Sequence, residues 1–375
     1  MEIYLDNSAT TQTCAAAADE AAKMMTMSYG NPSSQHKLGI EALGHLNKAR
    51  ERIATVLSCS DDEIFFTPSG TIANNTAIFG AAALNKRKGN TIVTTTIEHP
   101  SVLQPIGQLE AQGAQVIRLQ VDRSGNISEE ELFRAVNKNT ILVSIMAVNN
   151  EIGSINPVHL VQTAVKRSGS PALIHCDAVQ AFGKIKLKPA QMGIDLMSVS
   201  SHKIHGPKGA GALYVRKGLN LPPYIYGGGQ EKGLVSGTEA LPAIAGFGAA
   251  AAALPDVGME QVKLSYLREH FLTQIASMPG VTVNSPINAL PYIINISVLG
   301  VPSEVLINYL SSFEIYISAG SACKRGRKSE VIRMMGLSSQ RADSAVRISL
   351  SRFTTRDELD RLAEKINEAI VKFRR

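Results

Sequence analysis

Between about residue 90 and residue 218, short apolar stretches alternate with helix-like stretches. Each stretch is mostly apolar and is followed by polar residues; the stretches are Thr91–Thr96, Val116–Val121, Thr140–Val148, Ala172–Cys176, Asp195–Val199 and Ala212–Val215. Continuous apolar strands separated by helices indicate a largely parallel sheet that is covered on both faces. Such sheets bind ligands at the carboxyl ends of their strands. We therefore expect the polar residues that follow these strands to form a binding site.

The pattern changes after Pro255. The sequence predicts a helix of small residues at Ala243–Leu254, an amphipathic helix from Val257 to Pro279, and then strands at Ile293–Val298, Ile315–Ser318 and Ala345–Leu350. A capping box at Thr355 and Glu358 opens a final helix whose apolar residues keep helical spacing. We therefore predict an α/β protein in which a mainly parallel seven-stranded sheet forms a large domain, accompanied by a smaller α+β domain.

Composition narrows the class of protein. The chain has 375 residues, of which 44% are hydrophobic and 19% charged, so it can bury a large core. It has no apolar run of roughly 18 residues and no signal-peptide pattern. Its four cysteines are widely spaced without a CxxC pair, and the net charge is a modest +6. We expect a cytoplasmic protein without a membrane span, a metal site or direct binding to nucleic acid.

Lys203 follows a predicted strand and lies within Ser200-Ser201-His202-Lys203-Ile204-His205-Gly206-Pro207-Lys208-Gly209. Most lysines are simply exposed. A lysine at the end of a buried strand, beside hydroxyls and imidazoles, is also a candidate for a Schiff base, because burial lowers its pKa and frees the neutral amine. The hydroxyl of Ser200 and the ring of His202 would suit a phosphate group.

Asp177 ends the predicted strand Ala172–Cys176, where a carboxylate is costly to bury unless it is paired. One interpretation is a helix N-cap. The other is a partner for the pyridinium nitrogen of pyridoxal phosphate, with Gln180 reaching the ring hydroxyl from the same loop.

Two further segments are weaker candidates. Pro68-Ser69-Gly70-Thr71 stands between a predicted strand and a predicted helix, a junction that can bind an anion through free backbone N–H groups, although many such junctions bind nothing. Cys323 follows a run of Gly, Ser and Ala and precedes Lys324 and Arg325. Neighbouring cations favour the thiolate, so this cysteine is a candidate nucleophile, whereas most lone loop cysteines are inert.

Taken together, these segments resemble the NifS/IscS-type cysteine desulfurases, which are pyridoxal-phosphate enzymes of fold type I in the class V aminotransferase family. The resemblance runs nearly end to end. It rests on Tyr4-Leu5-Asp6-Asn7-Ser8-Ala9-Thr10-Thr11, Gly30-Asn31-Pro32-Ser33-Ser34, Glu98-His99, Val148-Asn149-Asn150-Glu151-Ile152-Gly153, Asp177-Ala178-Val179-Gln180, Ser201-His202-Lys203-Ile204-His205-Gly206-Pro207-Lys208-Gly209, Ser236-Gly237-Thr238, Gly320-Ser321-Ala322-Cys323 and Arg352-Phe353-Thr354-Thr355.

The resemblance implies a role for each cofactor residue. Lys203 would carry the cofactor as a Schiff base and later move the α-proton, and His99 would stack on the ring and assist proton transfer. Asp177 would pair with the ring nitrogen, while Asn150 and Gln180 hold the ring-hydroxyl side. The phosphate would be held by residues of two turns and one partner loop, namely Gly70, Thr71, Ser200, Ser201, His202 and, from the other subunit of a homodimer, Thr238.

The resemblance also implies how the substrate is used. Asn31 and Arg352 would hold the carboxylate of L-cysteine, and Cys323 would take the sulfur as a persulfide and pass it to an acceptor protein for iron–sulfur cluster assembly or tRNA thiolation. It further implies a large cofactor domain at 14–255 and a small domain at 1–13 and 256–375 that carries the catalytic cysteine loop.

The chain departs from the family pattern at several positions. The phosphate turn reads Pro-Ser-Gly-Thr-Ile, Val235 stands where arginine is common, and the loop after Cys323 is short and basic. Two alternatives therefore stay open beside the desulfurase: a selenocysteine lyase or another β-elimination enzyme, and a catalytically altered protein that only binds the cofactor.

Overall fold

A mainly parallel sheet forms the centre of the molecule. The computed structural model describes residues 2–320 and 329–374. The seven strands lie in the order β2 (Ile64–Thr67), β8 (Gly211–Val215), β7 (Leu196–Ser200), β6 (Leu173–Asp177), β5 (Thr140–Ser144), β3 (Thr91–Thr95) and β4 (Gln115–Leu119). Strand β8 runs antiparallel to both its neighbours, and the other pairs are parallel. The predicted seven-stranded, mainly parallel sheet is confirmed.

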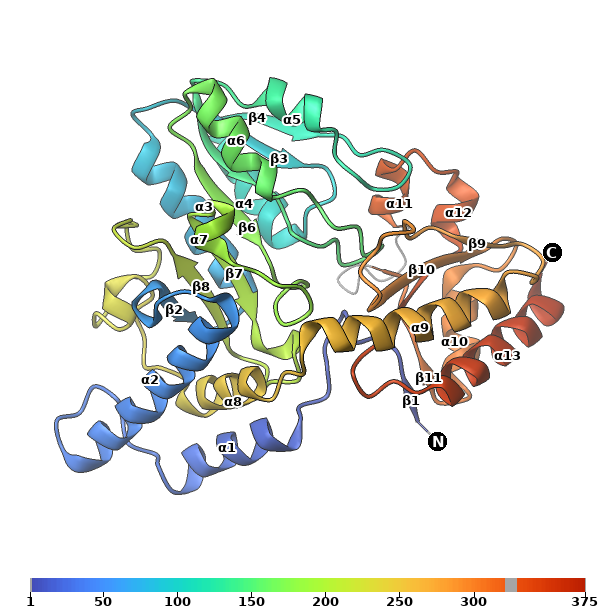
Figure 1. Cartoon of the computed structure of the whole chain (residues 1–375), viewed down its shortest axis with the longest axis horizontal. Helices are drawn as coiled ribbons and strands as arrows, with labels where there is room; N and C mark the ends of the chain where they lie inside the picture. The colour runs from blue at the N-terminus through green and yellow to red at the C-terminus, as the bar shows by residue number, and fades with distance from the viewer. Residues whose placement is uncertain (1, 321–328, 375) are drawn as a thin grey trace.

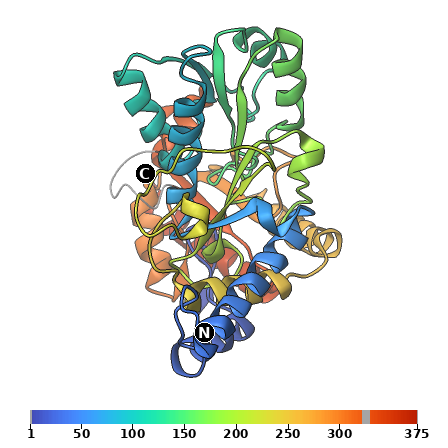
Figure 2. The same cartoon turned by 90° about the vertical axis from the view of Figure 1, so that its left-hand side faces the viewer.

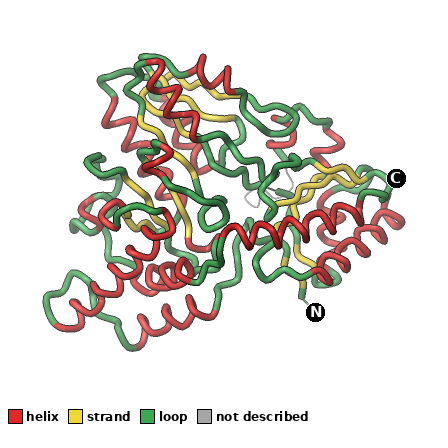
Figure 3. The backbone as a smooth tube through the Cα atoms, in the orientation of Figure 1, coloured by secondary structure: helices red, strands yellow, loops and turns green. Residues whose placement is uncertain are grey.

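Helices surround this sheet (Figures 1 and 3). They are α1 (Ala15–Thr26), α2 (Lys37–Leu57), α3 (Gly70–Asn85), α4 (Pro100–Ala111), α5 (Glu129–Ala135), α6 (His159–Ser168), α7 (Pro189–Met192) and α8 (Leu241–Ala252). Helix α8 packs against α1 and α2, which form the lower end of the molecule in Figure 2. A side chain on Gly248 would stand 2.6 Å from Cα of Ala49 in α2. This close approach explains why α8 consists largely of Ala and Gly.

The C-terminal part has its own small sheets. Strands β12 (Ala345–Ser349), β10 (Ile293–Val298) and β9 (Val281–Val283) form an antiparallel sheet, and β1 (Ile3–Tyr4) pairs with β11 (Ile315–Tyr316). The accompanying helices are α9 (Val257–Ile275), α10 (Ser303–Ser311), α11 (Glu330–Met334), α12 (Ser339–Asp343) and α13 (Arg356–Phe373). The capping box at Thr355 and Glu358 is confirmed at the start of α13. The boundaries 14–255 and 256–375 stay a prediction.

Two predicted elements differ from those observed. Strand β5 ends at Ser144 instead of Val148, although the backbone N–H groups of Ile145 and Ala147 still bond to β6 carbonyls. The apolar run is therefore longer than the strand because the chain stays buried beyond it. Helix α9 is apolar on its solvent side as well, where Met259, Val262 and Tyr266 are all more than half exposed.

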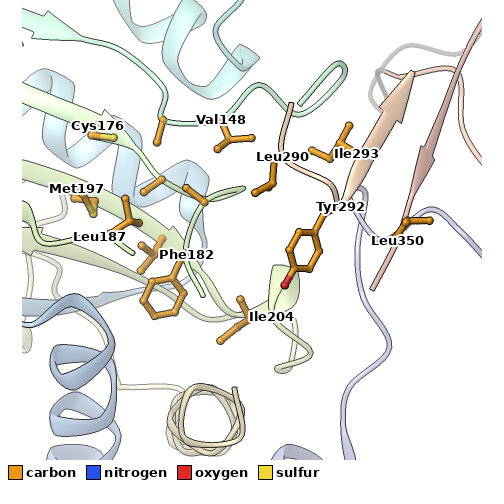
Figure 4. Close-up of a cluster of buried hydrophobic side chains, with 14 of the residues drawn as sticks. Val148, Cys176, Phe182, Leu187, Met197, Ile204, Leu290, Tyr292, Ile293 and Leu350 are labelled. Carbon is orange, nitrogen blue, oxygen red and sulfur yellow. The ribbon is translucent and has the colours of Figure 1, made fainter. Parts of the chain in front are cut away.

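The first residues of the chain join the large sheet to the C-terminal part. Asp6 forms a bridge with Ser349 at the end of β12, and the backbone N–H of Ser8 donates to Ser349 Oγ at 2.9 Å. On the other side, the backbone N–H of Thr11 donates to the His202 carbonyl at 2.9 Å. The same boundary holds buried apolar side chains from both parts, among them Ile204, Tyr292 and Leu350 (Figure 4).

Within residues 2–320 and 329–374, no single helix is both long and apolar enough to cross a membrane. The pair formed by α8 and α9, which is bent by 80°, meets that test by length and composition. The same residues contain no cluster of three or more His, Cys, Asp or Glu side chains with metal-binding geometry.

Candidate active site

A pocket of about 260 Å³ is lined by residues at the ends of the large-sheet strands and by residues of the C-terminal part. Predicted site residues from five separate segments line it, namely Gly70, Thr71, His99, Asn150, Asp177, Gln180, Ser200, His202 and Lys203. In a parallel sheet the carboxyl ends of the strands share one edge, so residues distant in sequence converge there.

Four predicted site residues lie elsewhere. Ser201 is buried beside the pocket, and Arg352 lines a smaller neighbouring cavity together with Lys203. Thr238 lies in a separate depression with Ser236, and Asn31 is exposed on the connection between α1 and α2. The remaining residue, Cys323, lies outside the described residues.

One end of the pocket is suited to an anion. Helix α3 begins at Gly70, and the first N–H groups of a helix have no intrahelical acceptor. A Cβ on Gly70 would stand 2.9 Å from Val179 and 3.3 Å from Ser200, so only glycine lets the turn come this close. The buried Ser200 Oγ has no hydrogen-bond partner among the described residues. These unpaired donors can hold a phosphate group.

Asp177 lies at the centre of a hydrogen-bond chain. It is 5% exposed; its Oδ1 accepts from the backbone N–H of Val179 at 3.0 Å, and its Oδ2 accepts from Asn74 Nδ2 at 2.8 Å. Asn74 Nδ2 also donates to Ser101 Oγ at 2.8 Å, and Ser101 Oγ lies 2.7 Å from Nδ1 of His99. This chain fixes the carboxylate and the imidazole relative to each other.

His99 is held as a neutral ring. Its Nδ1 accepts from the backbone N–H of Ser101 at 3.1 Å, so the proton of the neutral ring is on Nε2. Burial lowers the pKa of His99, the charge of Lys203 lowers it further, and Asp177 opposes the shift. A neutral imidazole beside the pocket can accept or relay a proton.

Lys203 reaches back toward the N-terminal segment. It lies in a 3-10 turn after β7, and its Nζ donates to the backbone carbonyls of Ser8 at 2.5 Å and Ala9 at 2.7 Å. These contacts hold the amine at the wall of the pocket that Asp177 also lines.

Sequence reasoning missed Arg347, which also lines the pocket. It is 1% exposed and supplies the only guanidinium among the described lining residues. Its Nη2 donates to Asp6 at 2.8 Å, and its Nη1 donates to the carbonyls of Asn150 and Gly320. A charged residue in the middle of the apolar stretch Ala345–Leu350 was a signal that could have identified it.

Glu98 is a second residue that sequence reasoning left without a role. Its carboxyl group lines the pocket, where Oε1 accepts from Thr95 and from the backbone N–H of Met146, and Oε2 has no partner among the described residues. Burial, together with the charge of Asp177, raises the pKa of Glu98 to about 8, although the hydrogen bonds from Met146 and Thr95 oppose the shift. The pocket therefore favours the neutral form of this carboxyl.

The residues on either side of 321–328 both meet Glu151. Gly320 lines the pocket in a backbone conformation with φ +91°, and a Cβ there would stand 2.8 Å from Glu151 Oε2. On the other side, Ser329 Oγ donates to the same oxygen at 2.6 Å. Gly320 and Ser329 therefore both lie beside one buried carboxylate at the pocket.

Comparisons with known proteins agree on the class. Residues 3–362 match the family model described as aminotransferase class-V. A NifS/IcsS protein homolog of Lactobacillus delbrueckii subsp. bulgaricus is 40% identical over 98% of this chain and 96% of its own. The cysteine desulfurase IscS of Methanosarcina thermophila is 37% identical, over 99% and 93%. A solved NifS-like protein superposes with a TM-score of 0.94 at 38% identity, covering all of both chains.

The fold and these matches define a class V aminotransferase. Within that class, the chain belongs to the NifS/IscS family of cysteine desulfurases, as its sequence motifs predicted. The predicted fold type I is confirmed.

Enzymes of this family use pyridoxal phosphate, and the pocket fits that group. The α3 N-terminus and the unpaired Ser200 Oγ suit the phosphate, and the buried Asp177 carboxylate suits a pyridinium nitrogen. The Lys203 amine on the same wall suits an aldehyde. Three chemically different requirements of one cofactor are thus met within one pocket.

Proposed function

We propose that this protein converts L-cysteine to L-alanine and transfers the sulfur to Cys323 as a persulfide. The observation that carries the proposal is the single pocket lined by Lys203, His99 and Asp177 beside a phosphate cradle, in a chain of the cysteine desulfurase family.

Each pocket residue has a proposed task. Lys203 holds the cofactor and moves the α-proton of the substrate, because its amine stands on the pocket wall. His99, whose Nδ1 carries no proton, relays a proton beside Lys203. Asp177 keeps the pyridinium nitrogen charged. Pyridoxal phosphate, when bound, supplies the electron sink for breaking the C–H and C–S bonds.

The substrate carboxylate needs a fixed cation. Arg347 meets this need better than the predicted Arg352, because its guanidinium lines the pocket whereas Arg352 lines the smaller cavity behind it. A guanidinium can bind a carboxylate through two parallel hydrogen bonds. We therefore propose Arg347 as the principal carboxylate residue.

Sulfur transfer balances without an external oxidant. The C–S bond of cysteine breaks, and Cβ keeps the electron pair and takes up a proton, giving the methyl group of alanine. The sulfur forms an S–S bond with Cys323 Sγ, so the enzyme thiol is oxidised to a persulfide while the substrate carbon is reduced. Lys324 and Arg325, adjacent in sequence, favour the thiolate that attacks.

We further propose a cytoplasmic homodimer that passes its persulfide sulfur to an acceptor protein for iron–sulfur assembly or tRNA thiolation. Four large apolar side chains are more than half exposed between residues 25 and 40, namely Met25, Met27, Tyr29 and Ile40. Such a group of exposed apolar residues is typical of an interface. A partner subunit would also explain why Thr238 and Asn31 do not line the pocket of their own chain.

The decisive experiment measures alanine released from L-cysteine by purified, reduced protein, with the visible absorbance of the bound cofactor recorded in parallel. We expect both signals in the wild type, neither in Lys203→Ala, and both in the control Lys208→Ala, which changes an exposed lysine of the same loop. A cofactor band without alanine, but with alanine formed from selenocysteine, would support the lyase instead. A Lys203→Ala variant that keeps both signals would overturn the role of Lys203.

A further inference from the structure

Lys184 is a buried lysine to which the proposed mechanism gives no task. It lies in the turn after β6, is 7% exposed, and its backbone carbonyl accepts from Gln261 Nε2 of α9 at 2.7 Å. Its Nζ donates to Gln180 Oε1 at 3.3 Å and lies 5.4 Å from the centre of the Tyr292 ring. Neither contact is an anion, so the structure keeps this amine buried at a cost.

Gln180 connects Lys184 to the pocket. Its Nε2 donates at 2.9 Å to the carbonyl of Ser8, and the same carbonyl accepts from Lys203 Nζ. Hydrogen bonds therefore connect Lys184 to Gln180, Gln180 to the Ser8 carbonyl, and that carbonyl to Lys203. Gln180 itself lines the pocket, whereas Lys184 lines only the smaller cavity behind it.

The contacts with Lys184 and with the Ser8 carbonyl allow the side-chain amide of Gln180 only one orientation. In its charged form the Lys184 side chain is only a donor, and a backbone carbonyl is only an acceptor. Turning the amide over would place two donors against each other at Lys184 and two acceptors against each other at Ser8. The amide nitrogen therefore faces the Ser8 carbonyl, which accepts one of its two N–H groups.

We propose that Lys184 is a positioning residue: it fixes the side-chain amide of Gln180 so that an N–H donor, and not the carbonyl oxygen, is presented to the ring-hydroxyl side of the cofactor. This inference rests on the proposed function of the pocket and deepens it. A fixed donor stabilises the anionic form of the ring oxygen, which in turn sets the proton affinity of the neighbouring Lys203 nitrogen.

The surroundings of Lys184 are rich in cations. Burial, together with the charges of Lys203 and Arg347, lowers the pKa of Lys184 to about 7. The remaining titratable groups that face the same cavity are those of His205, Arg352 and Tyr292, and Glu260 of α9 acts on Tyr292. A substitution at Lys184 thus changes both a hydrogen bond and a charge, and the experiment has to separate them.

The test uses the holoenzyme without cysteine and follows the visible cofactor band as a function of pH. In Lys184→Met, loss of the fixed donor raises the pH at the midpoint of the band's transition by about half a unit or more. Lys184→Arg, whose side chain is also only a donor, keeps the wild-type midpoint. If Lys184→Met does not fold, Lys184→Gln replaces it, because an amide both donates and accepts and cannot select one orientation.

A double-mutant cycle separates the hydrogen bond from the charge. In a Gln180→Ala background, Lys184→Met is expected to shift the midpoint by less than about half as much as in the wild type. An equal shift in both backgrounds would show that Lys184 acts through its charge alone and would overturn the proposal, as would an unchanged midpoint in Lys184→Met. Absence of a cofactor band in the wild type would instead contradict the proposed function.

Discussion

At the scale of single residues, Arg347 is a buried cation that can bind an anionic ligand in the pocket. Its Nη atoms bond to Asp6 and to two backbone carbonyls, while its Nε has no partner among the described residues. A buried guanidinium with an unused donor gains from a carboxylate ligand, because charge-assisted hydrogen bonds are the stronger ones.

The two arginines can be told apart kinetically. Arg347→Lys keeps a positive charge but loses the planar fork, so we expect KM for L-cysteine to rise by about 10-fold or more. The matched variant Arg352→Lys should raise KM less. Steady-state alanine formation at several cysteine concentrations measures both values. If Arg352→Lys raises KM more than Arg347→Lys does, Arg352 is the main residue that binds the substrate carboxylate, as the sequence suggested.

Cys323 is tested by separating binding from sulfur transfer. Cys323→Ala is expected to bind the cofactor normally and to release no alanine in a single turnover, because no thiol then accepts the sulfur. Cys59→Ala, which removes a thiol after the end of α2, serves as the control and should release alanine as the wild type does. Alanine released at the normal rate by Cys323→Ala would point to another thiol or to simple elimination.

At the scale of elements, β6 carries a buried histidine just before Asp177. His175 lies between Ser144 Oγ on β5 and Ser198 Oγ on β7, at 2.8 and 3.1 Å. Burial lowers the pKa of His175 from 6.5 to about 4. The three strands thus share a neutral imidazole directly behind the carboxylate of the site.

This histidine predicts an acid sensitivity of folding. Between pH about 6.5 and pH about 4, His175 is protonated in the unfolded chain and neutral in the folded chain. The free energy of unfolding therefore falls as pH falls through this window. His175→Gln should remove up to about 1.4 kcal/mol of that dependence per pH unit, measured by urea unfolding at several pH values. His159→Gln, at an exposed position, should leave the slope unchanged. Equal slopes in all three proteins would refute the assignment.

The same elements show what the sequence could and could not predict. Asp177 and Lys203 were predictable because both follow apolar strands, and parallel strands end at one edge. Arg347 was missed although its charge inside an apolar strand was a signal, because the sequence does not show which site such a buried charge faces. Asn74 and Lys184 were missed for a related reason. Asn74 bonds to Asp177, which is distant in sequence, and Lys184 bonds to the nearby Gln180, whose own partner Ser8 is distant; the sequence alone shows neither contact.

At the scale of the molecule, the connection between α1 and α2 extends away from the sheet (Figure 1). Apolar side chains in and beside this connection are exposed. If this surface is the dimer interface, Met27→Asp should raise the dimer dissociation constant by about 10-fold or more and weaken cofactor retention. The control is Val371→Asp on α13, a site that is equally apolar and 82% exposed. Analytical ultracentrifugation measures both. A wild-type monomer, or a Met27→Asp variant that dimerises normally, would contradict the homodimer proposed through this surface.

The short N-terminal segment has a consequence for how the enzyme is made. Its Ser8 carbonyl is the acceptor for the Lys203 amine, while its own position depends on Ser349, 341 residues later in the chain. During synthesis Ser8 leaves the ribosome long before Ser349, so the segment waits for its partner while the intervening residues emerge. The nascent polypeptide therefore cannot complete this site until residue 349 has emerged, and the reactive amine gains its final neighbours only after that point.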